Sequence, residues 1–158
     1  MARAREIPDL DCDAPFAEAA ARVIALRADE LFEHSEGVLD TGDIERVHDM
    51  RVATRRLRAA MEIFETCFPP KRWRRALRRV KALADSLGER RDRDVAIEFL
   101  AGFSGEVRGP DRDRLETVIG SLREEQREAN DGLAPAVDAK RLMKLRRRLD
   151  KLVAAAGE

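Results

Sequence analysis

The helical spacing of apolar side chains is the feature that most constrains the fold of this 158-residue chain. Leucines recur at steps of three, four and three in residues 138–154, and apolar residues follow steps of three and four in residues 111–133. Such positions gather on one face of an α-helix. We identify no strand, and the low aromatic content of 4% argues against a β-rich sandwich. The pattern therefore predicts an all-α fold, an antiparallel helical bundle of about five to six helices.

Prolines, glycines and acidic residues mark the expected helix boundaries. Pro69 and Pro70 end one helix and open the next. Gly88 is the expected residue just past the end of that next helix. Asp13 and Asp43 are the expected N-caps of the first two helices. The predicted helices cover residues 14–35, 44–66, 70–86, 91–103, 111–133 and 138–154.

The length suits a single domain with its own core. We expect residues 1–13, which are polar and end in DLDCD, to form a flexible tail, and residues 14–158 to form the bundle domain. The first residues lack the apolar segment of a signal peptide, and no run reaches the roughly 20 apolar residues of a membrane helix. We therefore predict a cytoplasmic protein without a membrane partner, in which Cys12 and Cys67 stay reduced.

Charge is balanced over the whole chain but is distributed unevenly. The net charge is zero, yet residues 45–94 contain fifteen Lys or Arg and eight Asp or Glu, a local charge of +7. The rest of the chain must then carry −7. This segregation indicates that one face of the protein meets an anion.

The stretch VHDMRVATRRLR, residues 47–58, is the most basic part of a predicted amphipathic helix. At 100° per residue, its basic stripe falls within about 80° of the helix surface and opposes an apolar face. The stripe contains His48, Arg51, Arg55 and Arg58. Such like charges repel one another, so the stripe is either a surface for an anion or a solvated, ion-paired face. Arg56 lies off the stripe and either contacts a neighbouring helix, pairs with an acid or binds the anion.

A second basic helix follows the proline pair. KRWRRALRRVK, residues 71–81, contains seven basic residues and no acid, and Trp73 with its apolar neighbours marks the inward face. Consecutive helices joined by a short turn pack antiparallel, so the basic flanks of the two helices are candidates to line one groove. Arginine dominates both helices, which favours a bidentate grip on phosphate oxygens.

Residue patterns of common catalytic and cofactor sites are missing. The two histidines, His34 and His48, and the two cysteines have no metal-ligand spacing, and no phosphate-binding glycine loop is present. His48 has no acid at the third or fourth position after it, which argues against a general base. We predict a binding protein with no catalytic residue, metal or cofactor. Asp92 or Asp94 is expected to cap a helix and to pair with an arginine.

The two motifs together resemble the CHAD domain, the conserved histidine α-helical domain. VHDMRVATRRLRAAMEIF and LADSLGERRDRDV follow the family's two signatures, one with a histidine and arginines on a helix and one around a Leu-Gly and Arg-x-Asp pattern. The resemblance implies a helical bundle that binds inorganic polyphosphate along a basic channel. The ligand residues it implies here, together with the basic stripe, are His48, Arg51, Arg55, Arg58, Arg56, Arg78, Lys81 and Arg91.

One departure from the family pattern bears on assembly. Family members generally contain two similar helical halves, each with a histidine-and-arginine helix, whereas this chain has one such motif and resembles the first half alone. A homodimer would replace the missing half by symmetry. Two other functions stay open on the sequence: a nucleic-acid-binding helical protein, and a dimeric scaffold for an acidic protein. Nucleic acid is the weaker fit because few aromatics are present for stacking. Association with polyphosphate granules is also left open.

Overall fold

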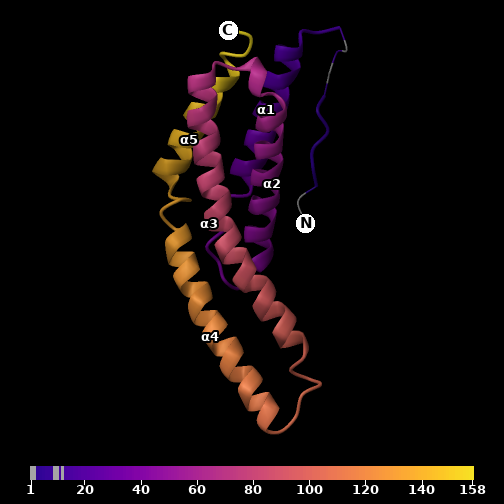
Figure 1. Cartoon of the computed structure of the whole chain (residues 1–158), viewed down its shortest axis with the longest axis vertical. Coiled ribbons are helices and arrows are strands. Elements are labelled where there is room, and N and C mark those ends of the chain that lie inside the picture. The colour runs from indigo at the N-terminus through magenta and orange to yellow at the C-terminus, as the bar shows by residue number, and fades with distance from the viewer. Residues whose placement is uncertain (1–2, 9–10, 12) are drawn as a thin grey trace.

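The computed structural model describes residues 3–8, 11 and 13–158. Within that part of the chain the fold is all-helical and contains no strand, which confirms the predicted class (Figure 1). The elements are α1 (Phe16–Glu33), α2 (Ile44–Ile63), a short 3-10 helix η1 (Glu65–Cys67), α3 (Pro70–Gly102), α4 (Pro110–Leu133) and α5 (Ala139–Val153).

Helices α1, α2 and α5 pack with the first part of α3 into a body, from which a hairpin of α3 and α4 projects (Figure 1). In the body, α1 packs against α2 and α5, and the first part of α3 packs between α2 and α5. The rest of α3 continues past the body and pairs with α4, which runs back to it. As a result, α2 lies along one flank of α3 and α5 lies along the other.

The core is built from the apolar faces that the periodicity predicts. Trp73 is 7% exposed, and its indole Nε1 donates a hydrogen bond to the carbonyl oxygen of Met61 at 3.0 Å. This bond connects α3 to α2 close to the turn between them. Further core residues of the body are Ala20, Ile24, Leu31, Val47, Met50, Leu57, Leu77, Val80, Leu145, Leu149 and Leu152.

The predicted helix break at Gly88 is wrong. Gly88 lies inside α3, which runs unbroken for 33 residues, and the segment predicted as a separate helix from about residue 91 is the second part of α3. A glycine within a helix costs only about 1 kcal/mol relative to alanine. Continuous burial of Leu83, Leu87 and Asp94 on either side of it outweighs that cost. Phe99, on the distal part of α3, is 65% exposed.

The predicted caps at the first two helices are not formed by side chains. The N-cap of α1 is Pro15, not Asp13. Asp43 does precede α2, but its carboxylate accepts a hydrogen bond from the Nε of Arg46 at 3.0 Å instead of capping the helix. The same Arg46 packs against Gly37, whose φ of +67° and close neighbour favour glycine in the turn before α2.

Parts of the predicted N-terminal tail lie outside the described residues, namely residues 1–2, 9–10 and 12, the last being Cys12. Of the described tail residues, Arg5 contacts α1: its backbone N–H donates to Glu30 at 2.6 Å and its guanidinium pairs with Glu33 at 3.2 Å. Cys67 is a buried free thiol. In the described part of the chain, no helix is both long and apolar enough to cross a membrane.

Candidate functional site

The basic stripe lies on the outer side of α2, as its spacing predicts. Met50, Ala53 and Leu57 turn into the core and are fully buried. The stripe residues are at least partly accessible: Arg55 is exposed, whereas His48, Arg51 and Arg58 are half-buried. One helix therefore separates the apolar core from a surface of like charge.

The structure brings this stripe together with the adjacent flank of α3. Glu62, near the end of α2, pairs through its Oε1 atom with Lys81 Nζ of α3 at 3.3 Å. The same oxygen lies 3.8 Å from Arg58 Nε. Because Arg78 and Lys81 are three residues apart on a helix, their side chains point to neighbouring positions. The two basic helices thus form one continuous surface, which we call the α2–α3 surface: His48, Arg51, Arg55, Arg58, Arg78 and Lys81.

Several cations of the α2–α3 surface lack a local counter-charge. Glu62 is shared by Arg58 and Lys81, whereas Arg51, Arg55 and Arg78 have no ion pair within 4.0 Å among the described residues. Uncompensated arginines on adjacent turns repel one another. Their guanidinium groups have free donors for a phosphate or carboxylate oxygen.

Arg56 and Arg91 are positioned differently from the stripe. Arg56 is half-buried, and its charge acts on Glu30 of α1. Burial alone raises the pKa of Glu30, but hydrogen bonds from the Arg5 amide and the Arg27 guanidinium, with the charges of Arg27 and Arg56, lower it below its ordinary value. Arg56 is therefore associated with the α1–α2 contact.

The Arg91 side chain is only 12% exposed and joins α3 to the start of α2. It lies 3.6 Å from Glu45 and donates a hydrogen bond to the carbonyl oxygen of Ile44 at 3.3 Å. An arginine held in this way helps fix the angle between the two basic helices. Its remaining donors have less access to an external anion than those of Arg51 or Arg55.

Three donor residues at the start of α2 lie close enough together to hold a metal ion. Glu45, His48 and Asp49 each offer one ligand atom, and these atoms lie within 4.8 Å of one another. Glu45 already pairs with Arg91, and Asp49 also has an interaction. These contacts compete with metal binding and favour a role for the two acids as counter-charges. The absence of a metal from the function stays a prediction.

Asp92 and Asp94 lie within α3, so the expected helix caps are wrong, but Asp94 does pair with an arginine. Asp94 and Arg90 are fully buried and their charged groups lie 3.1 Å apart. Gln126 of α4 donates to Asp94 at 2.6 Å. Burial raises the pKa of Asp94, and the Gln126 hydrogen bond and the Arg90 charge offset this only in part. This network connects the two helices of the hairpin and is structural.

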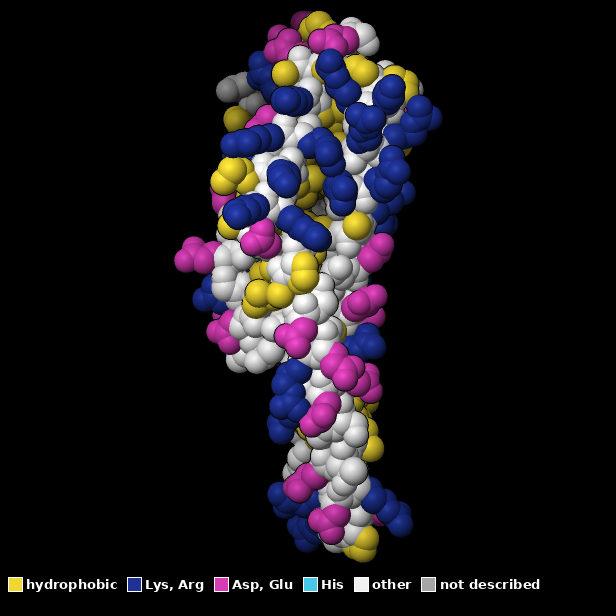
Figure 2. All heavy atoms as spheres, turned by 90° about the vertical axis from the view of Figure 1, so that its left-hand side faces the viewer, with side chains coloured by type: hydrophobic (Ala, Val, Ile, Leu, Met, Phe, Trp, Pro, Cys, Tyr) yellow, Lys and Arg dark blue, Asp and Glu magenta, His cyan; other side chains and the backbone are white. Residues whose placement is uncertain are grey.

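A second basic surface, which includes part of the run Arg146, Arg147 and Arg148, is not among the surfaces predicted from the sequence. Arg146 turns toward α1, where it pairs with Asp29 and lies 5.1 Å from the ring centre of Phe32. Arg147 and Arg148 instead line a hollow between α5 and α3. Figure 2 shows Lys and Arg side chains gathered over this part of the body, with very few acids between them. Basic residues at steps of three and four in both helices were the available signal.

Comparison with protein families identifies the class of this helical domain. The CHAD domain family model matches residues 22–158, nearly the whole chain. The chain belongs to the CHAD domain family. This family is associated with polyphosphate binding and is generally a non-catalytic helical module. A comparison with curated proteins returned no match.

Proposed function

We propose that this protein binds inorganic polyphosphate through the α2–α3 surface. The observation that carries the proposal is the pairing of Arg58 and Lys81, from two helices, with one carboxylate oxygen of Glu62. It supports a single continuous surface of cations along both helices. A linear polyanion matches such a surface because it offers phosphate oxygens repeatedly along its length.

The residue types on this surface favour phosphate over other anions. The stripe from His48 to Arg58 spans ten residue steps of α2, about 15 Å at the rise of an α-helix, and includes Arg51 and Arg55. Their planar guanidinium groups match two phosphate oxygens at once. His48 adds a ring N–H donor at the end of the stripe, and Arg56 and Arg91 contribute long-range positive charge from either side.

We infer a binding role and not an enzymatic one. Hydrolysis of a phosphoanhydride bond requires a placed nucleophile or general base and usually divalent cations held by carboxylates. The acids nearest the α2–α3 surface are engaged with its own cations: Glu62 with Lys81 and Arg58, and Glu45 with Arg91. Binding without turnover suits targeting of the protein to polyphosphate or regulation by it, in the cytoplasm or at polyphosphate granules.

The test is a titration of the purified protein with long-chain polyphosphate, by calorimetry, with Arg51→Gln/Arg55→Gln as the site variant. Each lost charge-assisted contact should cost about 1.5–3 kcal/mol, so we expect affinity to fall by at least tenfold. Arg112→Gln/Arg114→Gln is the matched control, because it removes two arginines from the far end of α4, where they pair with Glu116 and Asp111.

Two results would overturn the proposal. One is unchanged polyphosphate affinity in the site variant together with normal folding by circular dichroism. The other is a competition in which DNA or RNA of equal total charge displaces long-chain polyphosphate from the wild-type protein at lower concentration than polyphosphate itself. The second result would assign the surface to nucleic acid.

A further inference from the structure

The groove between α3 and α5 is a second concentration of positive charge, separate from the α2–α3 surface. Two hollows of about 330 and 410 Å³ lie along it and share Lys144 and Arg148 as lining residues, so they adjoin. We call the pair the α3–α5 groove. Its basic lining residues are Arg72, Arg75 and Arg79 from α3 and Arg141, Lys144, Arg147, Arg148 and Lys151 from α5.

Among the residues that the structure describes, no acid lines either hollow. Arg72 pairs with Glu158 at 3.0 Å. The other seven basic lining residues form no ion pair with any described residue. The unpaired cations in the groove repel one another, and an anion that binds among them relieves this repulsion.

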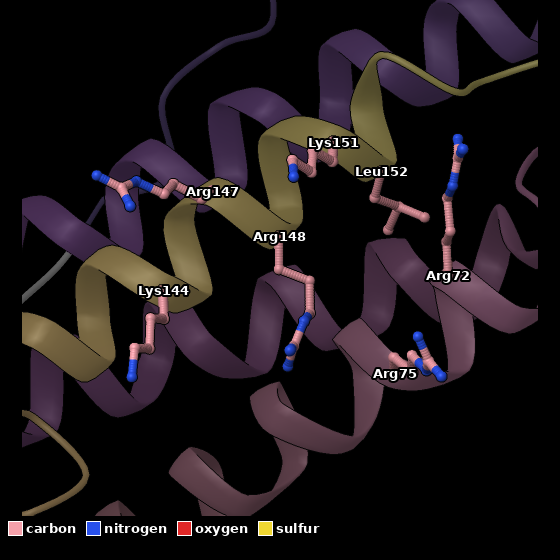
Figure 3. A pocket seen from close by; sticks show the side chains of 7 residues that line it. All are labelled: Arg72, Arg75, Lys144, Arg147, Arg148, Lys151 and Leu152. Carbon is pink, nitrogen blue, oxygen red and sulfur yellow. The ribbon is translucent and has the colours of Figure 1, made fainter.

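The groove is held open by the way α5 is anchored. Leu145, Leu149 and Leu152 of α5 are buried in the core. Asp138 caps the helix by accepting hydrogen bonds from the Lys140 and Arg141 amides at 3.0 and 3.3 Å. Because the apolar face of α5 is fixed in the core, its basic face lies on the surface beside α3. Figure 3 shows Arg148 extending from α5 toward α3, across from Arg75.

The two basic surfaces are separated only by α3. Lys81 lies on the flank of α3 that faces α2, because it reaches Glu62. Arg75 and Arg79 lie on the opposite flank, because they line the hollows with α5. Arg78 is exposed, and its position at 100° per residue places it between the two flanks. The outer side of α3 is therefore basic from one flank to the other, over a helix diameter of about 10–12 Å.

We propose that the α3–α5 groove is a second binding segment for condensed phosphate, and that one long polyphosphate chain crosses α3 to occupy both surfaces. This inference rests on the proposed function of the α2–α3 surface. A ligand long enough to fill both segments gains avidity, whereas a short ligand binds each segment separately. The preference for long polyphosphate chains over short ones therefore depends on the α3–α5 groove.

The test uses the full chain and a groove variant, Lys144→Gln/Arg148→Gln, which leaves the α2–α3 surface intact. Calorimetry with tripolyphosphate should give two molecules bound per wild-type chain and one per chain of the variant. Long-chain polyphosphate should bind the wild type about a hundredfold more tightly than it binds the variant, at the lower end of the gain from linking two sites. Circular dichroism confirms that the variant folds, and Arg112→Gln/Arg114→Gln again controls for lost charge.

The outcomes separate this inference from the proposed function. If the wild type binds no polyphosphate, both fail. If the wild type binds polyphosphate and the groove variant binds it with equal affinity and stoichiometry, the groove is not a binding segment, but the function of the α2–α3 surface stands. If the groove variant loses DNA or RNA binding and keeps polyphosphate binding, the groove serves nucleic acid and the inference is overturned.

Discussion

Arg58 of α2 and Lys81 of α3 contact the same carboxylate oxygen of Glu62, at 3.8 and 3.3 Å. The two cations are 23 positions apart in the sequence, and the turn at Pro69 and Pro70 makes them neighbours. Glu62 therefore acts as the local counter-charge of a surface that otherwise has more cations than anions. A phosphate oxygen entering the α2–α3 surface competes with this carboxylate.

Removing the Glu62 charge should strengthen polyphosphate binding. In Glu62→Gln, Arg58 and Lys81 become available to the ligand and a repulsive charge disappears, so affinity should rise by about fivefold or less, given the weak interaction of exposed charges in water. Calorimetric titration measures the change. Glu128→Gln, which removes an exposed acid from α4, should leave the affinity unchanged. A weaker complex for Glu62→Gln would mean that the carboxylate orders the site and does not compete with the ligand.

The salt dependence of binding should report the number of cations in contact with phosphate. Each neutralised phosphate adds roughly 0.7 to 0.9 to the slope of log affinity against log salt, by analogy with nucleic acids. The slope for Arg51→Gln/Arg55→Gln should therefore be shallower than that of the wild type by about one to two. Titrations at four salt concentrations give the slope. Parallel lines for the two proteins would show that neither arginine contacts the ligand.

Removing one partner of the buried Arg90–Asp94 pair should destabilise the protein much more than replacing both partners with apolar residues. Asp94→Ala leaves the Arg90 guanidinium buried without its carboxylate, so the free energy of unfolding should fall by about 3–5 kcal/mol. The double variant Arg90→Met/Asp94→Leu removes both charges, and its loss should be much smaller because no charge is left unpaired. Urea unfolding at pH 7 measures both. Equal losses in the two variants would indicate that packing, and not charge, dominates the site.

Glu30 should make the protein less stable in acid. Its pKa is lowered in the folded protein, so its contribution to stability is full above the ordinary value of 4.5 and is lost as the pH falls through the lowered folded value. The variant Glu30→Gln lacks this contribution. Between about pH 6 and pH 3, the free energy of unfolding of the variant should therefore fall less than that of the wild type. Urea unfolding across this range tests it, with exposed Glu106→Gln as the control. A variant curve parallel to that of the wild type would exclude Glu30 as the titrating group.

The homodimer expected from the missing second motif stays a prediction. Apolar side chains on the projecting part of α3 and at its C-cap are accessible for such a contact. Val95 is 47%, Phe99 65% and Phe103 41% exposed, and they follow one another at steps of four. Light scattering should give a mass twice the 17.9 kDa of one chain, and Phe99→Ser/Phe103→Ser should reduce it to that of the monomer. A monomeric mass for the wild type at micromolar concentration would contradict the dimer.

Much of the local structure follows from the sequence because it depends on neighbours in the chain. The spacing of Leu145, Leu149 and Leu152 predicts a helix and its buried face, and all three are in the core. The stripe of Arg51 and Arg55 is likewise a consequence of 3.6 residues per turn. The two family motifs add the CHAD fold, which the match over residues 22–158 confirms.

Tertiary structure decided the features that depend on contacts between distant segments. Local propensity favours a break at Gly88, but burial of Leu83, Leu87 and Asp94 against neighbouring helices makes α3 continuous. The helical spacing of its basic residues shows that α3 is basic around its outer side. Only packing determines which flank of α3 meets α2 and which meets α5. The sequence thus determined most of the helices and the stripe of like charge on α2. The antiparallel packing of α3 with α5 created the basic groove, because helix periodicity specifies a face but not the neighbour it meets.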